Sequence, residues 1–146
     1  MKALTNIELI HWCKMHGVKT LSGIYFKDDL PTKLINDTYY IINLQSSSSK
    51  GSGTHWTVFY YNTKQSLYYD SFGFMCPEEV VTLIKPYLYS KRTIQSMDSS
   101  ACGWYCLAFI VMTMTVKDKL RAFNSFVSLF NNLTSQNERV LQEILF

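Results

Sequence analysis

Residues 99–112 read SSACGWYCLAFIVM, and within them Ala101 to Met112 is the longest apolar run of the chain. Its twelve residues are too few for the ~20 that a membrane-spanning helix needs. Ser99 and Ser100 are favourable residues for the N-terminal cap of a helix. We therefore expect a helix from about Ala101 to Thr115. Because its residues are apolar on all sides, this helix is predicted to be the buried centre of the fold.

The composition is that of a single globular domain spanning residues 1–146. Hydrophobic residues make up 47% of the chain and charged residues only 17%, which excludes intrinsic disorder and a charged coiled coil. A net charge of +3 permits contact with nucleic acid but does not require it. Asn6, Glu8 and His11 interrupt the apolar residues where a signal peptide would have its core, so we expect a protein that is neither secreted nor in a membrane. The four cysteines are then expected to be thiols in a reducing compartment.

Sequence patterns predict a few strands and further helices around the central helix. Thr5 and Glu8 fit a capping box and Gly17 is a natural stop, so a helix is expected between them. Aromatic and β-branched residues predict strands at 39–44, 55–61, 66–71 and 92–96. Other expectations are a turn-like segment at 21–34, a loop at 45–53, a helix at 77–84, and one or two amphipathic helices from Lys117 onward. The predicted class is α+β, with a small mixed or antiparallel sheet packed around the buried helix.

His55 and Asp70 lie in two strands that we expect to form a hairpin, joined by a polar turn at residues 62–65. In an antiparallel pair, residues that face each other have a constant sum of residue numbers. A sum of 125 places His55 opposite Asp70, and a sum of 127 places Asp70 opposite Thr57, diagonal to His55 on the same face. Only an even sum separates them to opposite faces. The hairpin alone is equally consistent with a surface histidine and an aspartate that never meet.

Cys102 is the candidate nucleophile because it falls in the first turn of the predicted central helix. Unpaired N–H groups and the positive end of the helix dipole stabilise a thiolate there. The competing interpretation is a buried and unreactive thiol, which suits Cys13 and Cys106 well, while Cys76 lies in a loop with no evident base. Gln95 is a candidate donor to a developing oxyanion, together with the backbone N–H of Cys102.

The segment HWCKMH at residues 11–16 contains three side chains that could bind zinc. His11 and Cys13 would face different directions on a helix, and no second ligand pair has finger-like spacing. We therefore expect no metal site. No phosphate-binding loop of the Walker or dinucleotide type is present in the sequence.

Four short blocks surround the candidate residues, namely GTHW at 53–56, YDSFGF at 69–74, IQS at 94–96 and SACGWYC at 100–106. In this order they resemble the adenain-like cysteine proteases, the processing proteases of adenoviruses and of related viruses and virus-like mobile elements. A more distant similarity is to the proteases of ubiquitin-like modifiers such as SUMO. Four blocks in the family's order are far more specific than any one of them.

The resemblance implies a papain-like type of cysteine protease fold whose central helix starts at the nucleophile. Cys102 would be the nucleophile, His55 its general base, and Asp70 the residue that orients His55. Gln95 and the backbone N–H of Cys102 would form the oxyanion hole. Trp56 would bind substrate as a wall of the groove, although packing in the core explains an aromatic residue there equally well.

By the same resemblance, the substrates would be precursor capsid or core proteins. They would be cleaved at Gly-Gly or Gly-X sites during particle maturation, in the virion and in the nucleus or cytoplasm of the infected cell. The main alternative is an isopeptidase that removes SUMO- or ubiquitin-like modifiers with the same catalytic residues. A third is a catalytically dead binding scaffold, whose signature would be a missing catalytic residue, and none is missing.

The chain also departs from the adenovirus enzymes. It is shorter, and it has Asp70 where they carry a glutamate, although either carboxylate can orient a histidine. Those enzymes are activated by a peptide that forms a disulfide with them, and no cysteine here can be matched to that disulfide. No cofactor is therefore expected for the chemistry. The resemblance leaves stimulation by viral DNA open, but a net charge of +3 gives it no support. We expect a monomer whose partners are its protein substrates.

Overall fold

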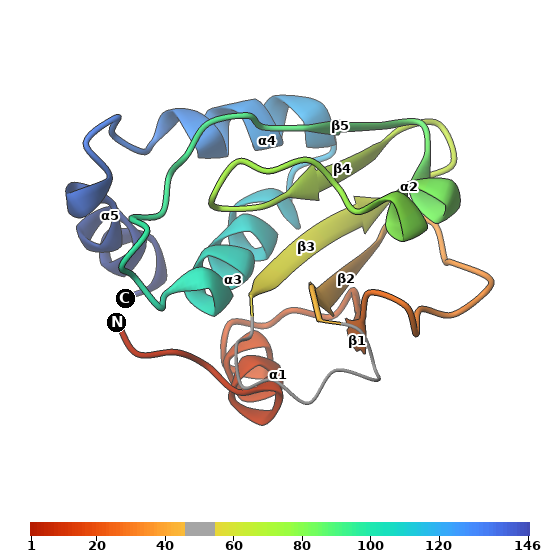
Figure 1. The fold of residues 1–146 in the computed structure, drawn as a ribbon, viewed down its shortest axis with the longest axis horizontal. Helices are drawn as coiled ribbons and strands as arrows, with labels where there is room; N and C mark the ends of the chain where they lie inside the picture. The colour runs from red at the N-terminus through yellow and green to blue at the C-terminus, as the bar shows by residue number, and fades with distance from the viewer. Residues whose placement is uncertain (46–54) are drawn as a thin grey trace.

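The computed structural model describes residues 1–45 and 55–146, so the predicted loop at 45–53 falls, except for Gln45, outside the described residues. In this described part five strands form one sheet in the order β1-β2-β3-β4-β5 (Figure 1). The strands are β1 (Leu21–Phe26), β2 (Thr38–Asn43), β3 (Trp56–Tyr61), β4 (Ser66–Tyr69) and β5 (Tyr87–Tyr89). The two outer pairs, β1–β2 and β4–β5, are parallel and the inner pairs are antiparallel, so the sheet is mixed as predicted.

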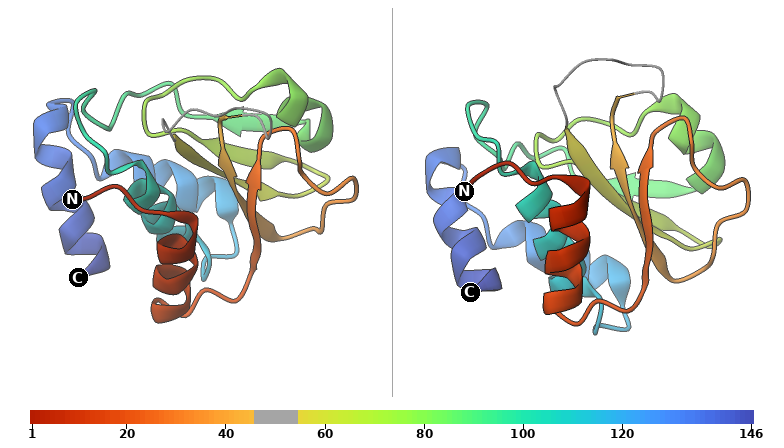
Figure 2. Two further views of the ribbon diagram at one scale, coloured as in Figure 1. Left: turned by 60° about the horizontal axis from the view of Figure 1, so that its bottom comes forward. Right: turned by 90° about the horizontal axis from the view of Figure 1, so that it is seen from below.

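The helices of the described ranges are α1 (Asn6–Met15), α2 (Glu78–Ile84), α3 (Cys102–Thr113), α4 (Lys119–Ser128) and α5 (Asn137–Leu145), with a 3-10 turn at Thr134–Gln136. Helix α2 lies on one face of the sheet, and α1, α3 and α4 lie on the other (Figures 1 and 2). Helices α1, α4 and α5 all pack against α3. None of these described helices combines the length and the apolar character needed to cross a membrane.

Helix α3 is the buried central helix that the apolar run predicts. Ten of its twelve residues are buried. It begins at Cys102, directly after Ala101, and the prediction that a serine would cap it is wrong, because Ala101 occupies the cap position without a side-chain hydrogen bond. The Ser99 hydroxyl instead accepts the N–H of Ala101 at 3.1 Å and donates to Glu138 at 2.8 Å.

The inner strands are buried on both faces, which explains their nearly continuous apolar sequences. Alternate residues of β2 point to opposite sides, as the two-residue period of a strand requires. Tyr39 and Ile41 pack with α3 in the larger hydrophobic cluster, whereas Tyr40 and Ile42 pack with α2 in the smaller one. The sheet therefore fixes α3 firmly against one face of β3, and this fixes where the first residue of α3 lies.

Most predicted elements are confirmed, and two expectations about strands are wrong besides the serine cap. The capping box of Thr5 and Glu8 is present, and α4 and α5 are the predicted amphipathic helices. Residues 21–34, which the sequence predicts to be turn-like, contain β1, a strand at the edge of the described sheet that pairs with β2. Residues 92–96 do not form a strand, because the N–H groups of Ile94 and Gln95 both donate to the carbonyl oxygen of Ser71, at 2.8 and 2.9 Å, in place of a ladder.

Candidate active site

The hairpin of β3 and β4 brings His55 and Asp70 together. The residue numbers of the observed pairs, such as Val58 with Tyr69, add up to 127. In this register Asp70, the residue after β4, lies on the same face as His55 and diagonal to it, as predicted. His55 Nε2 lies 2.7 Å from Asp70 Oδ1. The same carboxylate oxygen accepts the backbone N–H of Phe72 at 2.8 Å, and Asp70 is only 1% exposed. Two donors therefore fix this buried carboxylate against the histidine.

The electrostatic surroundings of His55 favour its protonated form. Burial lowers the pKa of His55, but hydrogen bonds with Asp70 and Cys102 and the charges of these two groups outweigh it and raise the pKa from 6.5 to about 9. Since Nε2 faces Asp70, the hydrogen bond with Cys102 belongs to the other side of the ring. An imidazolium between a carboxylate and a thiolate is the charge arrangement that an activated cysteine requires.

Cys102 is the first residue of α3 and is 6% exposed. Besides its interaction with His55, its sulfur accepts the backbone N–H of Trp56 at 3.5 Å. The other cysteines have different surroundings: burial raises the pKa of Cys13 to about 11, that of Cys76 to about 12, and that of Cys106 well above its ordinary value. These three thiols are therefore neutral at pH 7, as the sequence interpretation of Cys13 and Cys106 anticipated.

Gln95 lies beside Cys102 in the same cleft and is 1% exposed. Its Oε1 accepts the Ser71 hydroxyl at 2.5 Å, and its Nε2 donates to the carbonyl oxygen of Ser99 at 2.8 Å. These two bonds fix the side-chain amide, so that the second hydrogen of Nε2 is held in a defined direction. Ser71 has no role in the sequence interpretation, although it stands next to Asp70 in one of the four blocks.

Phe72 is a second residue that sequence reasoning missed. Its ring stacks on His55 with the ring centroids 4.6 Å apart and the planes inclined by 26°. Gly73 follows with φ +83°, and a Cβ there would lie 2.6 Å from the carbonyl oxygen of Arg92. Only glycine fits this turn without strain, and the turn places Phe72 over the histidine. The only signal in the sequence is that Phe72 and Gly73 stand two and three residues after Asp70.

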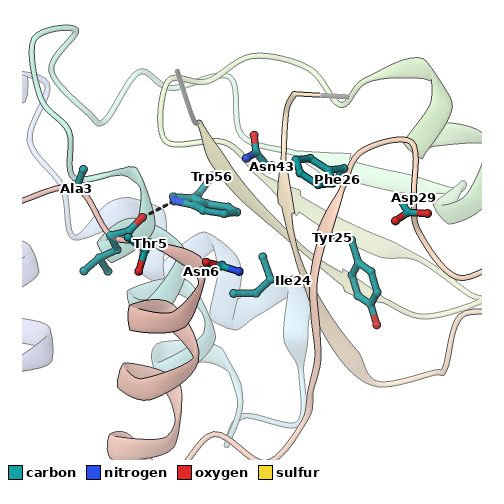
Figure 3. A pocket seen from close by; sticks show the side chains of 10 residues that line it. Ala3, Thr5, Asn6, Ile24, Tyr25, Phe26, Asp29, Asn43 and Trp56 are labelled. Carbon is teal, nitrogen blue, oxygen red and sulfur yellow. Dashed lines mark hydrogen bonds between the residues drawn. The ribbon is translucent and has the colours of Figure 1, made fainter. Parts of the chain in front are cut away.

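His55, Gln95 and Cys102 line one cleft of about 290 Å³, together with Ala3, Trp56, Phe72, Ser99 and Ser100. Asp70 is buried and contacts His55 without lining this cleft. Trp56 separates this cleft from a second one of about 620 Å³, which Figure 3 shows between the start of α1 and the strands β1 and β2. The indole N–H of Trp56 donates to the carbonyl oxygen of Leu4 at 2.8 Å, and the side chain is 6% exposed. Trp56 is thus a packed core residue and, at its surface, a shared wall of both clefts.

The potential zinc ligands do not come together. Among residues 1–45 and 55–146, no group of three or more His, Cys, Asp or Glu side chains is placed to hold a metal ion. Cys13 is buried in the core, and His11 lies exposed on the same helix.

No protein-family model and no curated protein matches the sequence significantly. Solved structures do match: two structures of the ASFV pS273R protease, one of them with selenomethionine, superpose with a TM-score of 0.62 each. Their sequences are 16% and 14% identical to this chain, and the match covers 99% of this chain and 68% and 67% of theirs. At this identity the likeness establishes the fold. The chain has the mixed α+β fold of the papain-like type that the sequence predicts.

Proposed function

We propose that this protein is a cysteine peptidase with Cys102 as its nucleophile. The observation that carries the proposal is that three side chains from segments far apart in the chain meet in one cleft, and that a buried carboxylate holds one of them, the histidine. The cleft residues His55, Gln95 and Cys102 come from the residue before β3, an irregular segment and the start of α3. The carboxylate is that of Asp70, the residue after β4. The ASFV pS273R protease supports the proposal as a protease that shares the fold.

In the proposed mechanism, the Cys102 sulfur attacks the carbonyl carbon of the scissile amide while its proton resides on His55. The carbonyl π electrons move to the oxygen, and this oxyanion accepts hydrogen bonds from Gln95 Nε2 and from the backbone N–H of Cys102. As the C–N bond breaks, His55 gives the proton to the departing amine. A thioester between Cys102 and the acyl part of the substrate remains.

Water completes the proposed cycle. His55, now neutral, takes a proton from a water molecule, whose oxygen attacks the thioester carbon. The C–S bond breaks, the acid product leaves, and the proton returns the Cys102–His55 pair to its starting state. Asp70 stabilises the imidazolium in both half-reactions through the 2.7 Å contact with Nε2.

The proposed substrates are precursor proteins of a virus or virus-like element, cleaved at Gly-Gly or Gly-X sites, in keeping with the adenain-like blocks of the sequence. Ala3 and Trp56 line both clefts, so a substrate that runs from one cleft to the other would pass these two residues, and this supports small residues beside the scissile bond. The second cleft extends the groove toward β1, and an extended chain of several residues would lie in it. The C-terminal tail of a ubiquitin-like modifier has the same extended character, which keeps the isopeptidase as the second candidate.

The test compares wild-type protein with Cys102→Ala and with Cys76→Ala, a matched removal of a buried thiol outside the cleft. Fluorogenic peptides with Gly-Gly or Gly-Ala at the cleavage site, purified capsid precursors and SUMO or ubiquitin conjugates are offered, each with and without double-stranded DNA. We expect wild type and Cys76→Ala to cleave peptides and precursors and Cys102→Ala to be inactive. Cleavage of the conjugates alone would favour the isopeptidase, and equal activity of Cys102→Ala would overturn the proposed chemistry.

A further inference from the structure

We call residues 94–101 the oxyanion segment, because they contain the proposed oxyanion donor Gln95. These residues form neither helix nor strand. Their backbone lies between the end of β5 and the start of α3. An irregular segment must be fixed by side chains from elsewhere if its donor is to point in one direction. Ser71 holds the backbone of Ile94 and Gln95 and the side chain of Gln95. Further contacts with this segment, at Ile94 and Ser99, come from one end of a distant helix, α5.

The first two residues of α5 contact the oxyanion segment at two places. Asn137 is fully buried, and its Nδ2 donates to the carbonyl oxygen of Ile94 at 2.8 Å. Its neighbour Glu138 accepts the hydroxyl of Ser99 at 2.8 Å. Asn137 is itself fixed, since its amide also binds the N–H and the carbonyl oxygen of Asn131 at 2.7 and 2.9 Å.

The contact with Glu138 leads directly to both proposed oxyanion donors. The Ser99 hydroxyl that donates to Glu138 also accepts the N–H of Ala101, the residue before Cys102. The carbonyl oxygen of Ser99 accepts Nε2 of Gln95 at 2.8 Å. One serine therefore links the Glu138 carboxylate to the side chain of Gln95 and to the backbone that precedes the nucleophile.

We propose that Glu138 and Asn137 are positioning residues of the oxyanion hole, which act through Ser99 and Ile94 on the two donors. This inference rests on the proposed function, because it assigns the contacts a role in the same reaction. Glu138 touches neither substrate nor the reacting atoms in this role. Its contribution is to keep the donors where the oxyanion develops, so it should affect the transition state and leave the thiolate of Cys102 untouched.

The decisive variants are Glu138→Ala, Glu138→Gln and Ser99→Ala, with Glu143→Ala as the matched control. Glu143 lies on α5 with its side chain 70% exposed and its carboxylate near Arg139. Glutamine retains an oxygen acceptor where Glu138 has Oε1, so it serves as the conservative rescue. Ser99→Ala removes the hydroxyl alone and leaves the contact of Glu138 with the Met1 amine in place.

We expect Glu138→Ala and Ser99→Ala to lower kcat by about 10- to 100-fold with KM within about twofold, the effect of a small misplacement of a catalytic group. Glu138→Gln and Glu143→Ala should stay close to wild type. Alkylation of Cys102 by iodoacetamide should keep its wild-type rate in all four, because this substitution forms no oxyanion. An unchanged kcat in Glu138→Ala, a parallel loss of alkylation, or a Glu138→Gln variant as slow as Glu138→Ala would overturn the assignment.

A second measurement does not depend on peptidase activity. The ¹⁵N order parameters of residues 95–99 should fall from about 0.85 toward about 0.6 in Glu138→Ala and stay high in Glu143→Ala. If the wild-type protein cleaved no peptide, the proposed function would fail, and these order parameters would still decide whether α5 fixes the oxyanion segment. Order parameters equal to wild type in Glu138→Ala would reject the positioning role.

Discussion

Replacement of His55 by alanine is expected to slow the alkylation of Cys102 about tenfold at pH 7. The structural basis is the position of His55 between Asp70 and Cys102, which raises the pKa of the histidine from 6.5 to about 9 in spite of its burial. By linkage, any stabilisation of the imidazolium by the Cys102 thiolate is equally a stabilisation of that thiolate by the imidazolium. Without His55, the thiolate keeps the N–H of Trp56 and the N-terminus of α3.

The magnitude follows from the rise in the pKa of His55. A rise from 6.5 to about 9 corresponds to about 3 kcal/mol in favour of the protonated histidine. Asp70 and Cys102 both contribute to this rise, and we expect the loss of the interaction with Cys102 to slow alkylation by about one order of magnitude. The faster alkylation of Cys102 in wild type than in His55→Ala should disappear as the pH rises through about 9, where His55 loses its proton.

The assay is a brief pulse of iodoacetamide between pH 6 and 9.5, followed by peptide mass mapping of each cysteine. Cys13 and Cys76 serve as internal references, because thiols with pKa values of about 11 and 12 are ionised to only about one part in 10⁴ and 10⁵ at pH 7. His11→Ala, which removes an exposed histidine on α1, is the matched control. Equal rates for Cys102 in wild type and His55→Ala, or a wild-type Cys102 as slow as the two references, would refute the reasoning.

Three further outcomes are expected. Gln95→Ala should lower kcat about 10²- to 10³-fold without slowing the alkylation of Cys102, and steady-state kinetics with equal kcat would contradict its role as oxyanion donor. Gly73→Ala should lower the free energy of unfolding by about 2–4 kcal/mol, because of the positive φ and the close carbonyl oxygen of Arg92; an unchanged urea midpoint would show that the turn adjusts without cost. His55 has a raised pKa, so the stability it adds is complete below pH 6.5 and is lost as the pH rises through about 9. Wild type should therefore lose up to about 3 kcal/mol relative to His55→Ala between pH 6 and 9.5 in urea unfolding, and parallel curves would contradict this.

The contact between His55 and Asp70, the proposed catalytic pair, could be predicted from sequence because it depends on local geometry. His55 and Asp70 flank one hairpin, so counting residues around the turn restricts them to a few registers. The observed sum of 127 is one of the two registers that place both side chains on the same face. Cys102 could be predicted because an apolar run of twelve residues marks where the central helix begins. In both cases a short-range pattern determines where the side chain lies.

The supporting contacts could not be predicted, because they join residues that are distant in the chain. Glu138 and Ser99 are 39 residues apart, and Asn137 and Ile94 are 43 apart. The spacing of hydrophobic residues along the sequence gives no information about such contacts. Strand β1 was missed for a related reason: as an edge strand it shows no regular alternation of burial, and its parallel partner comes from a separate segment.

The position of α5 has a consequence for when this protein becomes active during its own synthesis. Cys102, His55 and Asp70 all precede Asn137 in the chain, so the ribosome synthesises them first. While residues 137–145 are still within the ribosome, however, the segment that contains Gln95 has its contacts with Ser71 but lacks those with Asn137 and Glu138. The assignment made above to Glu138 and Asn137 then implies that a nascent chain has a reactive cysteine but little peptidase activity, and that cleavage of neighbouring polypeptides begins only after α5 has docked.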